Sequence, residues 1–220
     1  MSQQPDNKDP DSRSPDLGHS TPEDAKEIQL PLFPLNAHIF PEGRMRLKIF
    51  EPRYLRMVRE NAGRTPAFAM GMSGRRNPGG DFEVLPLATL VNVVDFEVLE
   101  GGLLGITIEG VEFAQVGAIE TESDGLRLAT LQPVPGWKDQ IDDSERLIEV
   151  SYNQVREEFA ELKLLYPTLE RQPPNWYVYR WLELLPISAE DKFEVLAEPS
   201  VAAAQALLLD ILRKSDLPGH

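Results

Sequence analysis

At 220 residues, with 41% of them hydrophobic, the chain is long enough to form one large domain or two small ones around real cores. A formal net charge of -14 opposes binding to nucleic acid, and the absence of cysteine excludes disulfides, thiolate nucleophiles and cysteine-bound zinc. Because no apolar run approaches the roughly 20 residues that span a bilayer, and the N-terminus lacks the pattern of a secretory signal, we expect a cytoplasmic protein without a membrane partner.

Residues 1–27 predict a disordered tail. They are rich in proline, serine, aspartate and glutamine, and they contain almost no apolar side chain that could be buried. Order is expected to begin at residues 28–35, Ile-Gln-Leu-Pro-Leu-Phe-Pro-Leu, where two prolines hold apolar residues in extended geometry. Because proline cannot donate a backbone hydrogen bond, we expect an edge strand there.

Residues 40–62 predict a turn, a strand and a helix. The Phe-Pro-Glu-Gly turn at 40–43 precedes residues 46–50, whose side chains alternate as in a strand. Pro52 suits the first position of a helix. The apolar residues that follow it at helical spacing are Tyr54, Leu55, Val58 and Ala62.

From residue 66 to residue 134 strands dominate the pattern. A strand of small residues at 66–72 and a glycine-rich loop at 73–80 come first. Further strands are expected at residues 88–99, 103–108, 111–119 and 126–131. Glycine-containing connections separate them at 100–102, 109–110 and 124–125, and short strands with such turns indicate a barrel or a sandwich.

Beyond Trp137 the apolar period changes from two to about 3.6, which predicts helices. One long amphipathic helix, capped at its start by Asp143 or Ser144, is expected from the spacing of Ile148, Tyr152, Val155, Phe159, Leu162 and Tyr166. Further helices are expected at residues 175–185, after the Ser-Ala-Glu-Asp capping box at 188–191, and after Ser200.

The change of period divides the chain. We expect a β-rich subdomain at residues 28–136, a helical bundle at 137–214 and a short tail at 215–220. The predicted fold class is therefore α+β, with the strands first and the bundle second.

No set of residues matches a catalytic arrangement. A nucleotide-binding loop needs glycines followed by Gly-Lys-Ser or Gly-Lys-Thr, and the sequence contains neither. Of His19, His38 and His220, two lie in the expected tails, so neither a metal site nor a histidine-based triad can be assembled. His38 is expected to be an ordinary loop residue. We expect no enzyme activity, no catalytic residue, no cofactor and no metal.

Positive charge is concentrated between Arg44 and Arg76. This segment holds nine basic residues against two glutamates, a net charge of +7 in a chain whose total is -14. Either the arginines pair with acidic residues elsewhere in the chain, or they form a patch that meets an acidic or unfolded partner. The candidate partner-binding residues are Arg53, Arg56, Arg75 and Arg76.

The order of several motifs resembles the Lon protease N-terminal (substrate-binding) domain family. The opening is Leu-Pro-Leu-Phe-Pro-Leu at 30–35, followed by Phe-Pro-Glu-Gly at 40–43 and Leu-Lys-Ile-Phe-Glu-Pro-Arg-Tyr at 47–54. Leu-Leu-Gly-Ile-Thr-Ile-Glu-Gly at 103–110 and Trp-Leu-Glu-Leu-Leu-Pro at 181–186 resemble later parts of the family. The resemblance covers essentially residues 28–213.

The resemblance implies a PUA-like β pseudobarrel followed by a helical bundle, and a domain that recognises unfolded or damaged polypeptide. We expect a stand-alone form without the ATPase and peptidase of the full protease. It would act, independently of ATP, as an adaptor or holdase in protein quality control, possible partners being a protease or chaperone machine. The alternative is a small-molecule-binding or sensing domain, because PUA-like relatives include RNA and ligand binders. Self-association is left open.

Overall fold

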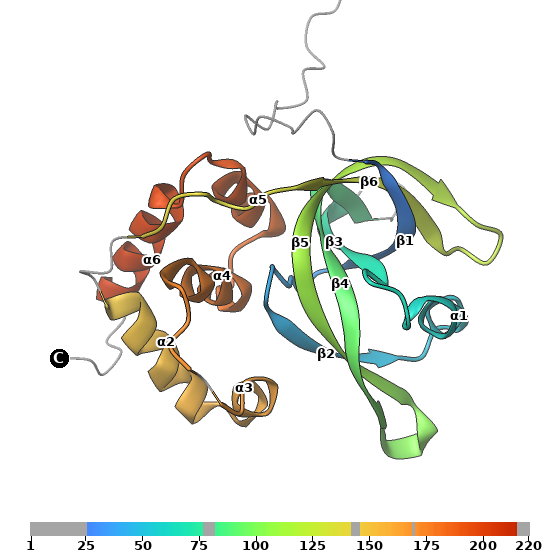
Figure 1. Cartoon of the computed structure of the whole chain (residues 1–220), viewed down its shortest axis with the longest axis horizontal. Helices are drawn as coiled ribbons and strands as arrows, with labels where there is room; N and C mark the ends of the chain where they lie inside the picture. Colours follow the sequence, from blue (N-terminus) through green and yellow to red (C-terminus); the bar gives the residue numbers. More distant parts are fainter. Residues whose placement is uncertain (1–25, 77–81, 142–145, 169, 215–220) are drawn as a thin grey trace, which may run out of the picture.

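The computed structural model describes residues 26–76, 82–141, 146–168 and 170–214 (Figure 1). A curved sheet with one short helix forms one half of the molecule, and the remaining helices pack beside it. The predicted α+β fold is confirmed. The tail expected at 1–27 lies outside the described residues up to residue 25, as do the tail at 215–220 and the cap expected at Asp143 or Ser144.

All strands in the described residues belong to one six-stranded sheet, in the order β2-β5-β4-β3-β1-β6, and β5 also pairs with β6. The strands are β1 (Ile28–Leu35), β2 (Arg44–Ile49), β3 (Phe68–Arg76), β4 (Phe82–Val98), β5 (Leu104–Thr121) and β6 (Arg127–Val134). The extra pairing joins β5, β4, β3, β1 and β6 into a closed ring, and closure removes most free strand edges. This sheet is consistent with the predicted pseudobarrel.

Strand β2 lies outside the ring. It pairs with residues 104–109 of β5, whereas β6 pairs with residues 113–121 of the same strand. Because β4 occupies the opposite side of β5, strands β2 and β6 take successive stretches of one side. Among the strands described, β2 pairs with β5 alone, so its second edge is open.

The prediction that residues 28–35 form an edge strand is wrong. β1 runs parallel to β3 and antiparallel to β6, so it lies inside the ring. The two pairings are offset along the strand: Pro31 has a partner only in β6, and Pro34 has one only in β3. Each proline therefore keeps one unpaired side, and this offset lets an interior strand hold residues that lack a backbone donor.

The connection predicted at residues 109–110 is also wrong, because β5 continues through it. A Cβ atom at Gly110 would lie 2.2 Å from the carbonyl oxygen of Phe40. Gly110 therefore lets a distant turn pack directly on the strand. The connections predicted at 100–102 and 124–125 are present, with positive φ at Gly101 (76°), Gly102 (76°) and Gly125 (85°).

Helix α1 (Pro52–Asn61) begins at the predicted proline, and Tyr54, Val58 and Ala62 pack on the core of the ring as predicted, but Leu55 does not. Met57, Val58 and Asn61 are buried, whereas Leu55 is exposed, because the helix turns its Met57 side toward the ring. The loop predicted at 73–80 is wrong at its start, since β3 extends to Arg76. Residues 77–80 lie outside the described part of the chain.

The helical half contains α2 (Leu147–Glu158), α3 (Ala160–Leu165), α4 (Pro174–Leu184), α5 (Ala189–Ala197) and α6 (Ala202–Lys214). The predicted cap of α5 is confirmed, because the amide of Asp191 donates to the Ser188 hydroxyl at 3.0 Å. Ser200 likewise accepts from the amide of Ala202, at the first residue of α6.

The single helix expected over 148–166 is broken at Phe159, whose φ of -103° and ψ of 113° are extended. The Arg156 side chain donates to the carbonyl of Tyr166 at 2.9 and 2.7 Å. In a continuous helix these residues would be about 15 Å apart, so this contact requires the chain to turn. The apolar spacing gave no sign of the break because it continues through it.

The buried apolar side chains of the described residues form three clusters. Two lie inside the sheet, around Phe68 and around Leu90. The third is built mainly from the helices and reaches the sheet through Phe40, Met72 and Phe113. The two halves thus share a continuous core, and the subdomain boundary expected at residue 136 stays a prediction.

Gly110→Ala should destabilise the protein by about 1–3 kcal/mol, because the added methyl group would overlap a backbone carbonyl that cannot rotate away. Urea unfolding of the variant and the wild type measures the difference. Gly63→Ala is the matched control: a Cβ there meets nothing within 4 Å, and we expect a change within about 0.5 kcal/mol. Equal stability of the two variants would contradict the close approach.

Candidate functional site

A groove with a volume of about 770 Å³ lies between the open edge of β2 and the helices α2, α3 and α4. In Figure 1 these elements face one another across the centre of the molecule. The strand wall is formed by Arg44, Met45, Arg46, Leu47 and Lys48. The apolar part of the helical wall is formed by Val155, Phe159, Leu162, Leu165 and Leu184.

The helical wall presents large apolar side chains to solvent. Phe159 is 57% exposed and Leu184 is 41% exposed, while Leu162 is half-buried beside them. Phe159 lies in the groove because α2 ends at this residue. The helix break therefore helps to form the groove wall. Apolar side chains gathered in a concave surface are typical of a binding site, whereas single exposed ones need no explanation.

The strand wall carries basic side chains that are largely matched by carboxylates. Arg44 contacts Glu109 at 2.7 Å, and Arg46 forms an ion pair with Glu97. Lys48 has no ion pair within the described residues. The groove therefore joins an apolar wall to a polar wall whose charge is mostly balanced.

A buried ion pair within α4 lines the groove and binds the backbone of the turn that precedes β2. Arg180 of α4 donates to Glu183 at 2.7 and 2.8 Å, and it also donates to the carbonyl of Pro41 at 3.0 Å. The amide of Phe40 donates to Glu183 at 2.6 Å. A Cβ atom at Gly43 would lie 2.4 Å from the same carboxylate, so glycine lets the turn pack this closely on the ion pair.

The two members of this pair sustain each other's charge. Burial raises the pKa of Glu183, and the guanidinium of Arg180 opposes that rise. Burial disfavours the charged form of Arg180, but the carboxylate outweighs it and raises the pKa of Arg180. An ion pair removed from water needs further hydrogen bonds to persist, and the backbone of residues 40 and 41 supplies them here.

Three buried polar groups in the groove lining lack a hydrogen-bond partner within the described residues: both ring nitrogens of His38, the hydroxyl of Tyr152 and Nη1 of Arg180. His38 was expected to be an ordinary loop residue; it lies outside any helix or strand, but it is buried. Burial and, to a smaller extent, the charge of Lys192 lower the pKa of His38 to about 4, and Glu190 opposes the shift. The imidazole is therefore neutral at pH 7.

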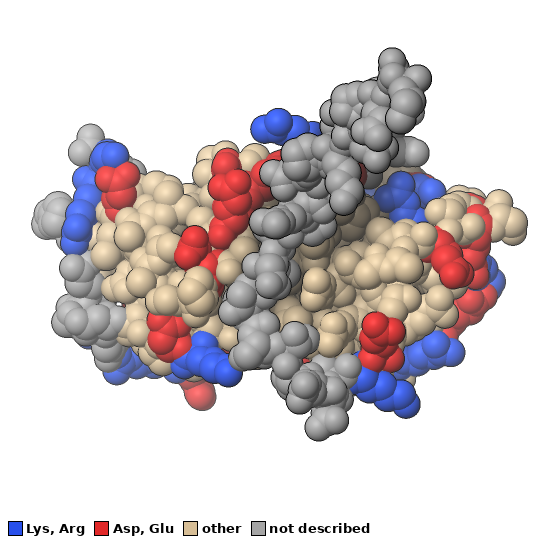
Figure 2. Space-filling view, turned by 90° about the horizontal axis from the view of Figure 1, so that it is seen from above, with Lys and Arg blue, Asp and Glu red and all other residues tan. Residues whose placement is uncertain are grey.

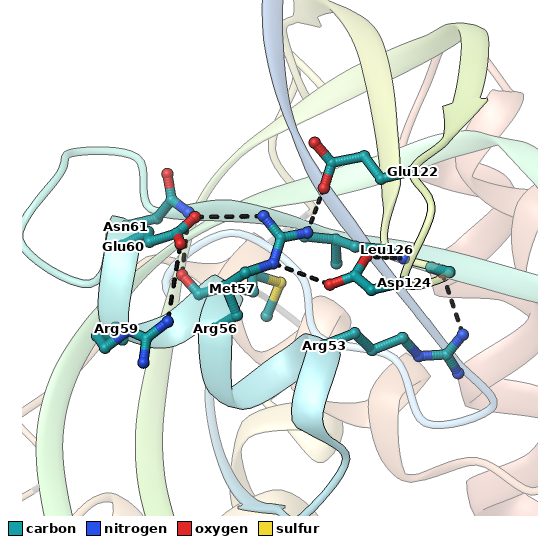
Figure 3. Close-up of polar contacts among 10 residues, drawn as sticks. Arg53, Arg56, Met57, Arg59, Glu60, Asn61, Glu122, Asp124 and Leu126 are labelled. Carbon is teal, nitrogen blue, oxygen red and sulfur yellow. Dashed lines mark hydrogen bonds and ion pairs between the residues drawn. The ribbon is translucent and has the colours of Figure 1, made fainter.

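The candidate residues on α1 do not line the groove. Figure 3 shows their polar contacts. Arg53 donates to the carbonyl of Gly125 at 3.1 Å. Arg56 contacts Asp124 at 2.9 Å and also pairs with Glu122, and these two hydrogen bonds raise its pKa. Both arginines thus tie α1 to the turn between β5 and β6.

The other candidates lie at the end of β3. The side chain of Arg75 is 89% exposed, and its closest carboxylate is Glu190 at 3.8 Å. Nothing is described of the Arg76 side chain, which lies outside the described residues. Figure 2 shows basic and acidic side chains next to one another at both ends of the face it displays. The structure thus places Arg53 and Arg56 on α1 and Arg75 at the end of β3.

The groove was not predicted from the sequence. The apolar spacing placed Phe159 on a buried stripe, because only the contact between Arg156 and Tyr166 reveals the break.

Within the described residues, no cluster of His, Cys, Asp or Glu could hold a metal ion. Over the same part of the chain, no helix is both long and apolar enough to cross a bilayer.

Comparisons with known proteins identify relatives of this fold. The family model of the ATP-dependent protease La (LON) substrate-binding domain matches residues 29–214. A Lon N-terminal domain protein from Xanthomonas campestris is 26% identical, with a TM-score of 0.60, and the match covers 83% of this chain and 98% of that one. The N-terminal domain of a Mycobacterium avium complex Lon protease is 12% identical, with a TM-score of 0.53 over 85% and 99% of the two chains, and shares the fold. A search of curated proteins found no match.

The lowered pKa of His38 predicts a loss of stability in mild acid. The unfolded chain binds a proton on this ring near pH 6.5, whereas the folded chain does so only near pH 4. Between these values the unfolded state holds more protons. The contribution of His38 is therefore fully present above about pH 6.5 and is lost as the pH falls toward 4, by on the order of 3 kcal/mol. Urea unfolding at a series of pH values measures it.

His38→Gln provides the control for this pH dependence, since glutamine is polar but does not titrate. The difference in free energy of unfolding between wild type and variant should shrink as the pH falls from about 7 to about 4. A difference that stays constant over this range would contradict the lowered pKa.

Proposed function

The chain belongs to the family of the ATP-dependent protease La (LON) substrate-binding domain, and from this membership we propose that it binds unfolded or damaged polypeptide in the groove between β2 and the helices α2, α3 and α4. The observation that carries the proposal is the exposed apolar wall around Phe159 and Leu184. An unfolded chain exposes apolar side chains that a folded protein buries, so such a wall selects for it.

In this proposal the chain catalyses no reaction and acts as an adaptor or a holdase in protein quality control, with no need for ATP. Support comes from the family match, which is to a substrate-binding domain over residues 29–214. The groove chemistry agrees, because the buried His38 has no hydrogen-bond partner among the described residues that would orient it as a general base. The bound polypeptide would be kept from aggregating or transferred to a protease or chaperone.

A second candidate function is small-molecule binding. The observation that favours it is the convergence of His38, Tyr152 and Arg180 under the groove with unpartnered polar atoms. A small number of polar groups that converge beside an apolar wall is typical of small-ligand pockets. The groove is open along β2, however, and an open apolar wall favours a chain-like ligand.

Leu184→Ser should weaken the binding of an unfolded polypeptide about tenfold, because a leucine contact of about 1.5 kcal/mol is lost. Leu164→Ser is the matched control, since Leu164 is 65% exposed but does not line the groove. Fluorescence anisotropy with labelled, reduced and carboxymethylated lactalbumin measures both affinities. Equal effects of the two variants would contradict the groove, and a small molecule retained in native mass spectrometry would then favour the second function.

We also propose Arg75 as a contact for acidic segments of the bound chain, because its side chain is the most exposed of the candidate arginines whose side chains are described. Arg75→Glu should weaken lactalbumin binding a few-fold in about 0.05 M salt and have little effect near 0.5 M, where charges are screened. Stability should change by less than about 0.5 kcal/mol. An affinity that is insensitive to both the substitution and the salt would contradict this contact.

A further inference from the structure

The strand wall of the groove is the edge of β2. Consecutive residues of a strand point to opposite faces, yet Arg44, Met45, Arg46, Leu47 and Lys48 all line the groove. They can do so only if the groove runs along the backbone of the strand. This is the edge that pairs with none of the described strands.

The backbone groups that face the groove follow from the pairing on the other side. Gly110 donates to the carbonyl of Gly43 at 2.9 Å, so the carbonyl of Gly43 points toward β5, while its amide donates to Phe40 within the turn. The N–H and C=O groups of successive strand residues alternate between the two edges. Those of Arg44, Arg46 and Lys48 therefore point into the groove.

Tyr166 supplies independent support for this orientation. Its hydroxyl, at the end of α3, accepts a hydrogen bond from the amide of Arg44 at 2.7 Å across the groove. The amides of Arg46 and Lys48 point the same way and have no such partner within the described residues. The N–H and C=O groups of these two residues are thus open to a ligand. They lie two residues apart, which matches the two-residue repeat of backbone groups in an extended chain.

We propose that the bound polypeptide adds to the sheet as an extended strand along the open edge of β2, an inference that rests on the proposed function. Its backbone pairs with Arg46 and Lys48, and the Tyr166 hydroxyl on the Arg44 amide ends the pairing at that side. Neighbouring strands lie about 4.8 Å apart, so the added strand brings its side chains to the helical wall. Apolar ones contact Phe159 and Leu184.

This mode of binding explains how one site can accept many unfolded sequences. Backbone hydrogen bonds are common to all polypeptides, and they are free only in a segment that has left its own secondary structure. Open strand edges usually invite pairing between sheets. Here the helical wall faces the edge, so a single chain has access where a second sheet would meet α3 and α4.

Arg46→Pro tests the proposal, with Arg46→Ala as the matched control. Both variants lose the side chain and its ion pair with Glu97, but only proline removes the amide that faces the groove. Pairing with β5 keeps its donors, because this amide does not face β5. The ligand is a fluorescein-labelled ten-residue peptide of alternating leucine and serine with a lysine at each end.

We expect the alanine variant to bind the peptide within about twofold of the wild type and the proline variant at least about tenfold more weakly, as for one lost backbone hydrogen bond. Equal affinities of the two variants would overturn strand addition. Circular dichroism checks that the proline variant folds.

Hydrogen exchange followed by NMR keeps the test valid if the proline variant does not fold. In the wild type, the peptide should slow exchange of the Arg46 and Lys48 amides at least tenfold, while the Met45 and Leu47 amides, which face β5, stay protected with or without it. Unprotected Arg46 and Lys48 amides in the peptide complex would overturn the proposal. So would protection that grows with protein concentration alone, which would identify a second copy of the chain as the occupant.

The two levels of the hypothesis fail differently. If the wild type binds neither the peptide nor unfolded lactalbumin, the proposed function fails and strand addition fails with it. If lactalbumin binds in a manner that depends on Leu184 while the Arg46 and Lys48 amides remain unprotected, the function stands and strand addition alone is overturned.

Discussion

The buried ion pair between Arg180 and Glu183 is the contact on which the groove depends. Its charges are shielded from water and satisfied partly by backbone groups of residues 40 and 41. Removing one partner of a buried pair typically costs about 3–5 kcal/mol, so the turn and helix α4 are held in one arrangement. Because β2 starts directly after this turn, the same contact sets the distance between the open strand edge and the helical wall.

Two glycines make that docking sterically possible. Gly43 lets the turn approach the Glu183 carboxylate, and Gly110 lets the backbone of Phe40 lie on β5. Phe40 then carries the core of the helical half into the sheet, where it packs near Phe113 with ring centroids 5.9 Å apart. The groove is thus bounded by rigid elements on both sides, which favours a binding site that is formed before its ligand arrives.

The basic segment is mostly matched inside the protein. Arg44, Arg46 and Arg56 each contact a carboxylate on β4, β5 or the turn after β5. Exposed ion pairs of this kind contribute at most about 1 kcal/mol each, so their main effect is on which strands and turns lie together. Internal pairing thus accounts for the two arginines of β2 and for Arg56, whereas the side chain of Arg75 is 89% exposed and lies 3.8 Å from Glu190.

The sequence by itself determined the α+β class, the order of strands and helices, the glycine turns at 101–102 and 125, and the cap at Ser188, because these depend on the conformational preferences of neighbouring residues. Only the tertiary structure decided that Gly110 continues a strand, that β1 lies inside the ring and that the long helix breaks at Phe159. The physical reason is distance along the chain. Gly110 packs against Phe40, β1 pairs with β3 and β6, and the helix break allows the contact of Arg156 with Tyr166. A local sequence pattern does not specify which remote segment will lie against a residue.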